Sequence, residues 1–161
     1  FLANQQDIDV LIRMFRTKGD DQWRADVKRL LAKTSRTFEI EVANREAMYK
    51  QMRTPDAGED LAEALNNYAW LICNTEGDFG KALKNSLRSL EFVEDSAKLD
   101  TCGRCYFALG DFDNAIRVQK RALELDPYSP PLKLLCSSNP KSDLAALKQW
   151  LMPLALIWPF R

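Results

Sequence analysis

Residues 99–127 read L-D-T-C-G-R-C-Y-F-A-L-G-D-F-D-N-A-I-R-V-Q-K-R-A-L-E-L-D-P, and much of this stretch repeats an earlier one. The segment L-N-N-Y-A-W-L-I at 65–72 aligns with L-D-T-C-G-R-C-Y at 99–106, 34 residues later. The segment G-D-F-G-K-A-L from Gly77 aligns with G-D-F-D-N-A-I from Gly110, 33 residues later. A fixed period of this length is the signature of a repeat protein.

Each copy of the repeat has two halves that read as amphipathic helices. Apolar residues recur at three- and four-residue spacings in both halves, which is the pattern of a helix with one buried face. The Gly-Asp pair between the halves is a helix stop followed by a cap for the next helix. We therefore predict two helix hairpins, near 60–92 and 95–126.

The two copies resemble the tetratricopeptide repeat (TPR) family. In the second copy the matching residues are Leu99, Gly103, Tyr106, Gly110, Asp111, Phe112, Ala115, Ala122 and Pro127. In the first copy they are Leu65, Asn67, Ala69, Gly77, Asp78, Phe79 and Ala82. The resemblance implies an all-α fold, a right-handed array of antiparallel helix hairpins. A small residue at Ala69 and Gly103 would let the two helices of each hairpin approach closely.

The N-terminal region reads as a degenerate third copy followed by a long helix. Residues 8–19 keep the internal spacings of the repeat, with the bulky Ile12 at the small site. No helix breaker occurs between Asp21 and Met52, which predicts a helix of about 45 Å. Thr54–Gly58 is predicted to end this helix as a linker. We expect 1–56 to form this N-terminal helical region and 57–127 to form the two TPR hairpins.

The C-terminal part, 128–161, is predicted to be a helical and apolar tail that packs on the repeats. Leu151–Phe160 is almost wholly apolar but contains two prolines, and it falls well short of the ~20 residues that a membrane span needs. An interfacial anchor is an alternative. Burial on the repeats or on a second copy of the chain is favoured, because an uncovered apolar patch would aggregate. Burial on a second copy would make the chain self-associate through this tail.

Composition favours a protein partner over nucleic acid. Twenty-three Lys and Arg offset 23 Asp and Glu in the 161 residues, so no global field attracts a polyanion. The chain has no histidine, which removes the commonest general base and metal ligand, and we expect neither catalysis nor a cofactor. Phe1 is not followed by a basic region, an apolar stretch and a small-residue cleavage site, so we do not expect a signal peptide in this stretch. We expect the C-terminal repeat region of a larger protein, in a compartment that the sequence does not fix, with the cytoplasm slightly favoured.

The leading hypothesis is a non-catalytic scaffold that binds a protein or peptide on its concave face. The resemblance implies that the first helix of each hairpin lines this face. This face would present an aromatic anchor, an arginine with a fork-shaped guanidinium group, and amide side chains. The residues expected on it are Asn66, Trp70, Asn74, Asp100, Arg104 and Phe107. Burial of Trp70 and Phe107 against neighbouring helices remains open. If this face binds a peptide, Trp70→Ala and Arg104→Ala should weaken capture of the partner without lowering stability. Asn66 and Trp70 occupy the first site of the chaperone-type carboxylate clamp, which disfavours that subclass.

Cys102 and Cys105 form a C-x-x-C pair that offers an alternative function, a thiol-based metal or redox site. Zinc requires four ligands, and without histidine only Cys73 and Cys136 could add soft ligands. A thioredoxin-like dithiol would open a helix after a strand, and no strand is predicted. Packing within the repeat is the favoured interpretation of the pair.

Overall fold

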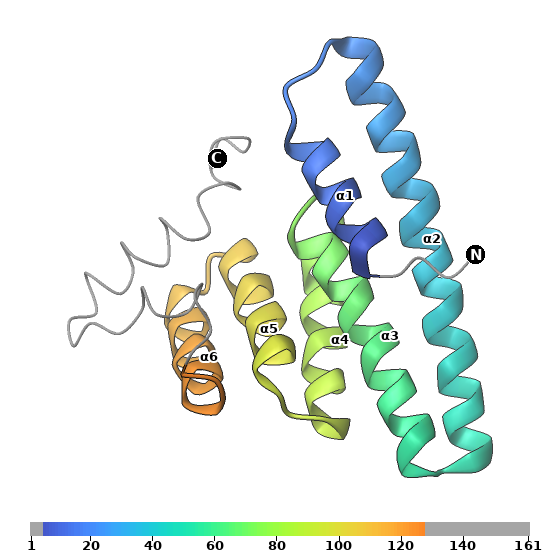
Figure 1. Ribbon diagram of the computed structural model, residues 1–161, viewed down its shortest axis with the longest axis vertical. Coiled ribbons are helices and arrows are strands. Elements are labelled where there is room, and N and C mark those ends of the chain that lie inside the picture. Colours follow the sequence, from blue (N-terminus) through green and yellow to red (C-terminus); the bar gives the residue numbers. More distant parts are fainter. Residues whose placement is uncertain (1–4, 128–161) are drawn as a thin grey trace.

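The computed structural model describes residues 5–127 of the chain, and within this range every regular element is a helix. The helices are α1 (Gln5–Arg16), α2 (Asp21–Met52), α3 (Pro55–Cys73), α4 (Phe79–Phe92), α5 (Ser96–Ala108) and α6 (Phe112–Leu125). They pair in chain order as three hairpins that stand side by side (Figure 1). The predicted all-α fold is confirmed, and the expectations for the tail at 128–161 lie outside the described residues.

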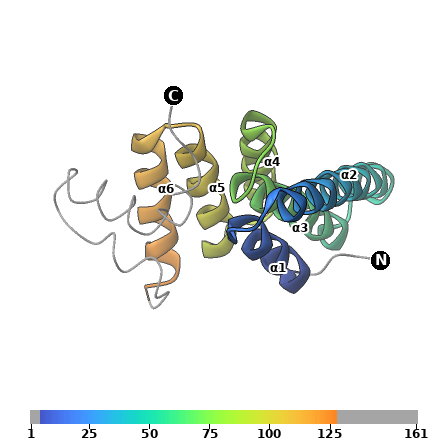
Figure 2. The same cartoon turned by 90° about the horizontal axis from the view of Figure 1, so that it is seen from above.

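The hairpins pack on one another through a regular pattern of helix contacts. Within each hairpin the two helices touch, and the second helix of one hairpin touches the first helix of the next, α2 on α3 and α4 on α5. The first helices also contact one another in the order α1, α3, α5. Seen from above, the hairpins form a row that runs from α2 to α6 (Figure 2). The helices α1, α3 and α5 therefore share one side of the array, as the repeat alignment predicts.

The predicted long helix is present as α2, which spans Asp21–Met52. Its start is capped by Asp20, whose side chain accepts a hydrogen bond from the backbone N–H of Trp23 at 2.7 Å. Its end is closed by Arg53, which adopts a left-handed conformation with φ 49°, a common way to stop a helix. Despite the length of α2, no helix in the described range is long and apolar enough to cross a membrane.

The prediction of a linker at Thr54–Gly58 is wrong, because α3 already begins at Pro55. Thr54 is the N-cap and accepts from the backbone N–H of Ala57 at 3.3 Å. Proline is well suited to the first helical position, where its missing N–H costs nothing. Gly58 is buried within the helix, close to the ring of Phe92. The residues that read as breakers are a helix cap and a packing position.

The degenerate N-terminal copy forms a hairpin with a buried core of its own. Ile8 is fully buried, and Leu11 and Ile12 are each 4% exposed. These side chains belong to one core cluster with Val27 and Phe38 of α2 and with residues of α3. The bulky Ile12 is therefore accommodated at the position that Ala69 and Gly103 hold in the other two hairpins.

Ion pairs tie α2 to the following hairpin along much of its length. Arg45 of α2 pairs with Asp60 of α3 at 2.6 Å, and Arg88 of α4 pairs with Glu46 of α2 at 2.9 Å. Lys81 of α4 also pairs with Glu39 of α2. Each such surface pair contributes at most about 1 kcal/mol, so their main effect is to fix the register of α2 against its neighbours.

The turns inside the two repeat hairpins contain the predicted Gly-Asp signal. Gly77 and Gly110 adopt positive φ values of 142° and 78°, which side chains disfavour. The aspartates that follow them cap α4 and α6, with Asp78 accepting from Lys81 N at 2.9 Å and Asp111 from Asn114 N at 3.2 Å. The helix stop and the cap are both confirmed.

Gly110→Ala is expected to lower the free energy of unfolding by about 1 kcal/mol, through backbone strain alone. A Cβ at Gly110 would meet no atom within 4 Å, so no steric clash adds to this cost. Urea denaturation of the variant measures the loss. A variant as stable as the parent would mean that Gly110 does not need its left-handed conformation.

Candidate functional site

An amide at the end of α3 is the centre of a polar cluster on the shared side of α1, α3 and α5. The Oδ1 atom of Asn74 accepts hydrogen bonds from Arg16 Nη2 at 2.7 Å and from Arg104 Nη1 at 3.3 Å. The Nδ2 atom of Asn74 donates to the backbone oxygen of Trp70 at 2.9 Å. Asn74 is only 1% exposed. It therefore lies beneath the two guanidinium groups and orients both.

Trp70 lies beside this amide, between a cation on one neighbouring helix and an acid on the other. The guanidinium carbon of Arg104 is 4.7 Å from the centre of the Trp70 ring, which is within the range of a cation–π contact. The indole Nε1 donates to Asp9 Oδ1 on α1 at 3.1 Å. The ring is half-buried. One side chain of α3 thus joins α1 and α5.

Asp100 holds Arg104 in this position from within α5. Its Oδ2 accepts from Arg104 Nε at 3.2 Å, and its Oδ1 accepts from Gln119 Nε2 of α6 at 2.8 Å. Gln119 is fully buried, so its amide is a fixed support for the carboxylate. We call the following six residues the inner-face cluster: Asp9, Arg16, Trp70, Asn74, Asp100 and Arg104.

Arg16 is a half-buried cation beside the positive charge of Arg104. Within the part of the chain that the structure describes, Arg16 forms no ion pair, and its buried Nε has no hydrogen-bond partner. Burial, followed by the positive charge of Arg104, lowers the pKa of Arg16 from its ordinary value. An added anion beside Arg16 would relieve both the charge repulsion and the unmatched donor.

Two of the six predicted site residues lie away from the cluster. Asn66 is buried at 9% exposure, and its Oδ1 has no hydrogen-bond partner. Phe107 is 4% exposed and packs on Phe112 of α6, with ring centres 5.3 Å apart. Their side chains are covered by the protein itself, so the structure gathers Trp70, Asn74, Asp100 and Arg104 and leaves Asn66 and Phe107 in the core.

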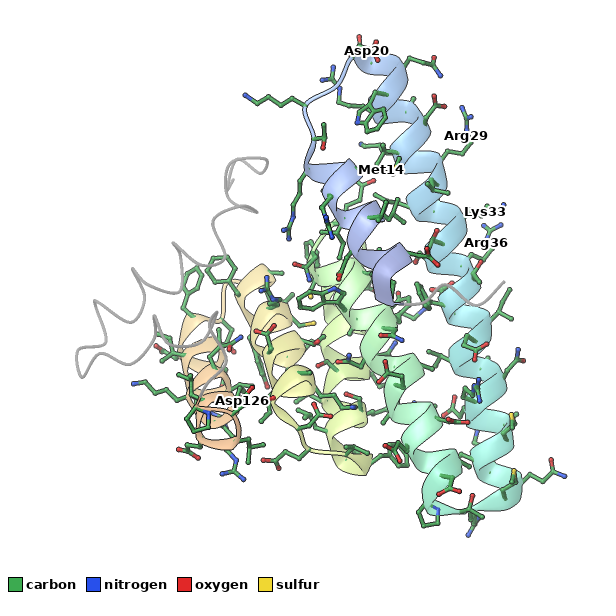
Figure 3. The ribbon with its side chains drawn as sticks, viewed as in Figure 1. Met14, Asp20, Arg29, Lys33, Arg36 and Asp126 are labelled. Atoms are coloured by element: carbon green, nitrogen blue, oxygen red, sulfur yellow. The ribbon has the colours of Figure 1, made fainter. Side chains whose placement is uncertain are left out.

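Two members of the inner-face cluster come from α1, and the sequence analysis did not find them. In the side-chain view, the label Met14 marks the C-terminal part of α1, the helix from which both residues come (Figure 3). A signal for them exists in the degenerate copy. When this copy is aligned at Ile12, Asp9 falls in the register of Asp100, and Arg16 falls in the register of Phe107. If the predicted concave face had been extended to the first helix of the N-terminal hairpin, it would have included both Asp9 and Arg16.

The C-x-x-C pair is divided between two parts of the core. Cys102 packs with residues of α5 and α6, whereas Cys105 belongs to the cluster formed with α1, α2 and α3. Burial raises the pKa of Cys102 to about 11. A hydrogen bond with Cys73, followed by burial, raises the pKa of Cys105 well above its ordinary value.

These shifts keep both thiols protonated at neutral pH, which disfavours a thiolate ligand or nucleophile. Among the described residues, no three His, Cys, Asp or Glu side chains are grouped to hold a metal.

Comparison with known proteins identifies one repeat. The model of the tetratricopeptide repeat family matches residues 97–129, a range that covers almost all of α5 and the whole of α6. No curated protein and no solved structure matches the chain. The family match supports protein binding as a general role, and it names no partner and no binding face. The similarity of the other two hairpins to this one is inferred from the sequence alignment and from the way they pack.

Proposed function

We propose that this chain is a non-catalytic protein-interaction module that binds a peptide segment across α1, α3 and α5, with an acidic side chain of the peptide at the inner-face cluster. The observation that supports this most is the convergence of Arg16 and Arg104 on one amide beside a half-buried tryptophan. A tetratricopeptide repeat match over the α5–α6 hairpin supports the general role.

The chemistry of the cluster suits a carboxylate next to an apolar group. Arginine presents a planar fork that binds a carboxylate through two parallel hydrogen bonds, and Arg104 is already oriented by Asp100 and Asn74. Arg16 offers an unmatched Nε donor. Tryptophan is a frequent hot spot at interfaces because it buries a large rigid surface. A peptide carboxylate between the two arginines would therefore have its neighbouring side chain beside Trp70.

Two features support a non-catalytic role. The chain contains no histidine, so the commonest general acid and base is missing. The matched family is typically non-catalytic. The alternative thiol site at Cys102 and Cys105 gains no support, because burial raises the pKa of Cys102, and a hydrogen bond with Cys73, followed by burial, raises the pKa of Cys105.

Selection from a random-sequence peptide library displayed on phage tests this proposal with the intact chain. We expect the selected peptides to be enriched in Asp or Glu. The dissociation constant of a selected peptide should rise at least about 10-fold in Arg16→Gln, because a charged hydrogen bond contributes about 1.5–3 kcal/mol. It should also rise with salt concentration, because the contact is between charges.

Arg36→Gln is the matched control for this experiment. Arg36 is exposed on α2 and points away from the body of the molecule (Figure 3), so the same change of charge there should leave peptide binding unchanged. Selected peptides without acidic enrichment would contradict the acidic ligand. Equal weakening by Arg16→Gln and Arg36→Gln would mean that binding reports only the total charge of the protein.

A further inference from the structure

The carboxylate that orients Arg104 is itself held from the second helix of its hairpin. Gln119 of α6 reaches across to α5, where its Nε2 donates to Asp100 Oδ1 at 2.8 Å and to the backbone oxygen of Asp100 at 3.3 Å. An ionised carboxylate only accepts hydrogen bonds, so the nitrogen of the amide is the atom that faces it. Asp100 Oδ2 accepts in turn from Arg104 Nε at 3.2 Å. A chain of contacts therefore joins a buried amide to a cation of the inner-face cluster.

The buried amide of Gln119 is not an efficient way to fill this part of the core. Gln119 is fully buried, and its Oε1 has no hydrogen-bond partner among the described residues. A buried acceptor without a partner lowers the stability of the fold. An apolar side chain of the same length would fill the same space without this cost. The packing of α6 on α5 therefore does not explain why the position carries an amide.

The equivalent position of the preceding hairpin is occupied by a shorter side chain. Gln119 aligns with Ser86 at the 33-residue spacing of the two turns, and Ser86 is also fully buried. Asp100 aligns with Asn66, whose Oδ1 has no hydrogen-bond partner in the described part of the chain. The α3–α4 hairpin thus packs with a serine where the α5–α6 hairpin has the glutamine, and the fold of a hairpin does not depend on this amide.

We propose that Gln119 is a positioning residue for the inner-face cluster: it holds Arg104, through Asp100, in the orientation that a peptide carboxylate meets. Gln119 lies in the core and does not touch the ligand. The inference rests on the proposed function for the nature of the ligand, whereas the orientation of Arg104 can be measured in the protein alone.

The contacts of Arg104 show how the loss of the amide would reach the ligand. Its guanidinium donates to Asp100 Oδ2 and to Asn74 Oδ1, and it faces the Trp70 ring at 4.7 Å. The side chain of Asp100 is 18% exposed, so water can replace Gln119 at Oδ1. The carboxylate would then rotate, and Arg104 Nε would lose a fixed acceptor. A peptide would have to order the guanidinium on binding, which lowers affinity.

NMR spectroscopy of Gln119→Met in the free chain tests the positioning. Methionine keeps the length of the side chain but has no donor. The Arg104 Nε–H should exchange with water at least about 3-fold faster in this variant, because its acceptor is less fixed. The melting temperature should not fall, because the unpartnered buried oxygen is removed. Unchanged exchange, or a large fall in melting temperature, would make the amide structural and would overturn the inference whether or not a peptide binds.

The dissociation constant of a selected acidic peptide tests the consequence for binding. It should rise about 3- to 10-fold in Gln119→Met, as for the loss of one hydrogen bond. An unchanged constant in Gln119→Met, for a peptide that Arg104→Gln weakens, would overturn the inference and leave the proposed function standing. Selected peptides without acidic residues would instead overturn the proposed function, and the exchange of Arg104 Nε–H would still decide the role of Gln119.

Ala122→Gly is the matched control on the same helix. Ala122 is fully buried on α6, and this change leaves the Gln119 amide in place. Glycine should lower the melting temperature by about 2–4 °C or more, while the exchange of Arg104 Nε–H and the dissociation constant stay at their parent values. If Ala122→Gly changed both as much as Gln119→Met, the effect would come from the stability of α6, and the positioning role would be wrong.

Discussion

Gly103→Leu is expected to lower the free energy of unfolding by about 3 kcal/mol, near the upper end of the cost of overpacking a core. A Cβ at this position would lie 2.6 Å from Gln119 Nε2 and 2.9 Å from Gln119 Cγ. Gln119 cannot easily move aside, because its fully buried amide donates to Asp100. Leucine would therefore force α5 and α6 apart. Urea denaturation followed by circular dichroism measures the loss.

Gly80→Ala is the matched control for this prediction. Gly80 is an exposed helical residue near the start of α4, where a Cβ would meet only Asp78 Oδ1 at 3.3 Å. Alanine is favoured over glycine in a helix by about 1 kcal/mol, so this variant should be as stable as the parent or slightly more stable. If Gly103→Leu matched the stability of Gly80→Ala, the register of α5 against α6 would be wrong.

The sequence predicts most of the fold because its signals are local and repeated. The small residue at Gly103, the Gly-Asp turns and the uninterrupted helical pattern from Asp21 to Met52 each act over a few residues, and each agrees with its neighbours. The predicted ends of α2 match those observed, because Asp20 caps one end and Arg53 stops the other. Thr54–Gly58 was misread because a proline at the first helical position looks like a breaker in isolation.

The site is predicted less completely because it is built from contacts between hairpins. The alignment places Trp70 and Arg104 on facing helices, but it does not show that Asn74 lies beneath Arg16 and Arg104. It also places Phe107 on the concave face, whereas the ring turns toward Phe112 of α6. A register position gives the side of the helix from which a side chain leaves, but the rotamer also decides where its ring lies, and for Phe107 that depends on the packing against α6.

Trp70→Ala is expected to weaken peptide binding and also to lower the free energy of unfolding by about 2–4 kcal/mol. The sequence alone predicts a loss of binding without a loss of stability. The structure argues otherwise, because the half-buried ring packs on the core cluster and its indole N–H donates to Asp9 of α1. Truncation leaves a cavity and removes both the cation–π contact with Arg104 and the link to α1. Denaturant titration gives the loss of stability.

Trp70→Phe separates the two roles of this side chain. Phenylalanine keeps much of the buried ring and the aromatic face toward Arg104, but it cannot donate to Asp9 Oδ1. Its cost should therefore be close to that of one hydrogen bond to a charged acceptor, about 1.5–3 kcal/mol, and smaller than the cost of Trp70→Ala. Hydrogen exchange should show faster opening of α1 in both variants, because the hydrogen bond from Trp70 of α3 to Asp9 of α1 is lost in each. Unchanged exchange in α1 would mean that Trp70 does not hold α1 against the repeats, and that its place in the inner-face cluster serves ligand contact alone.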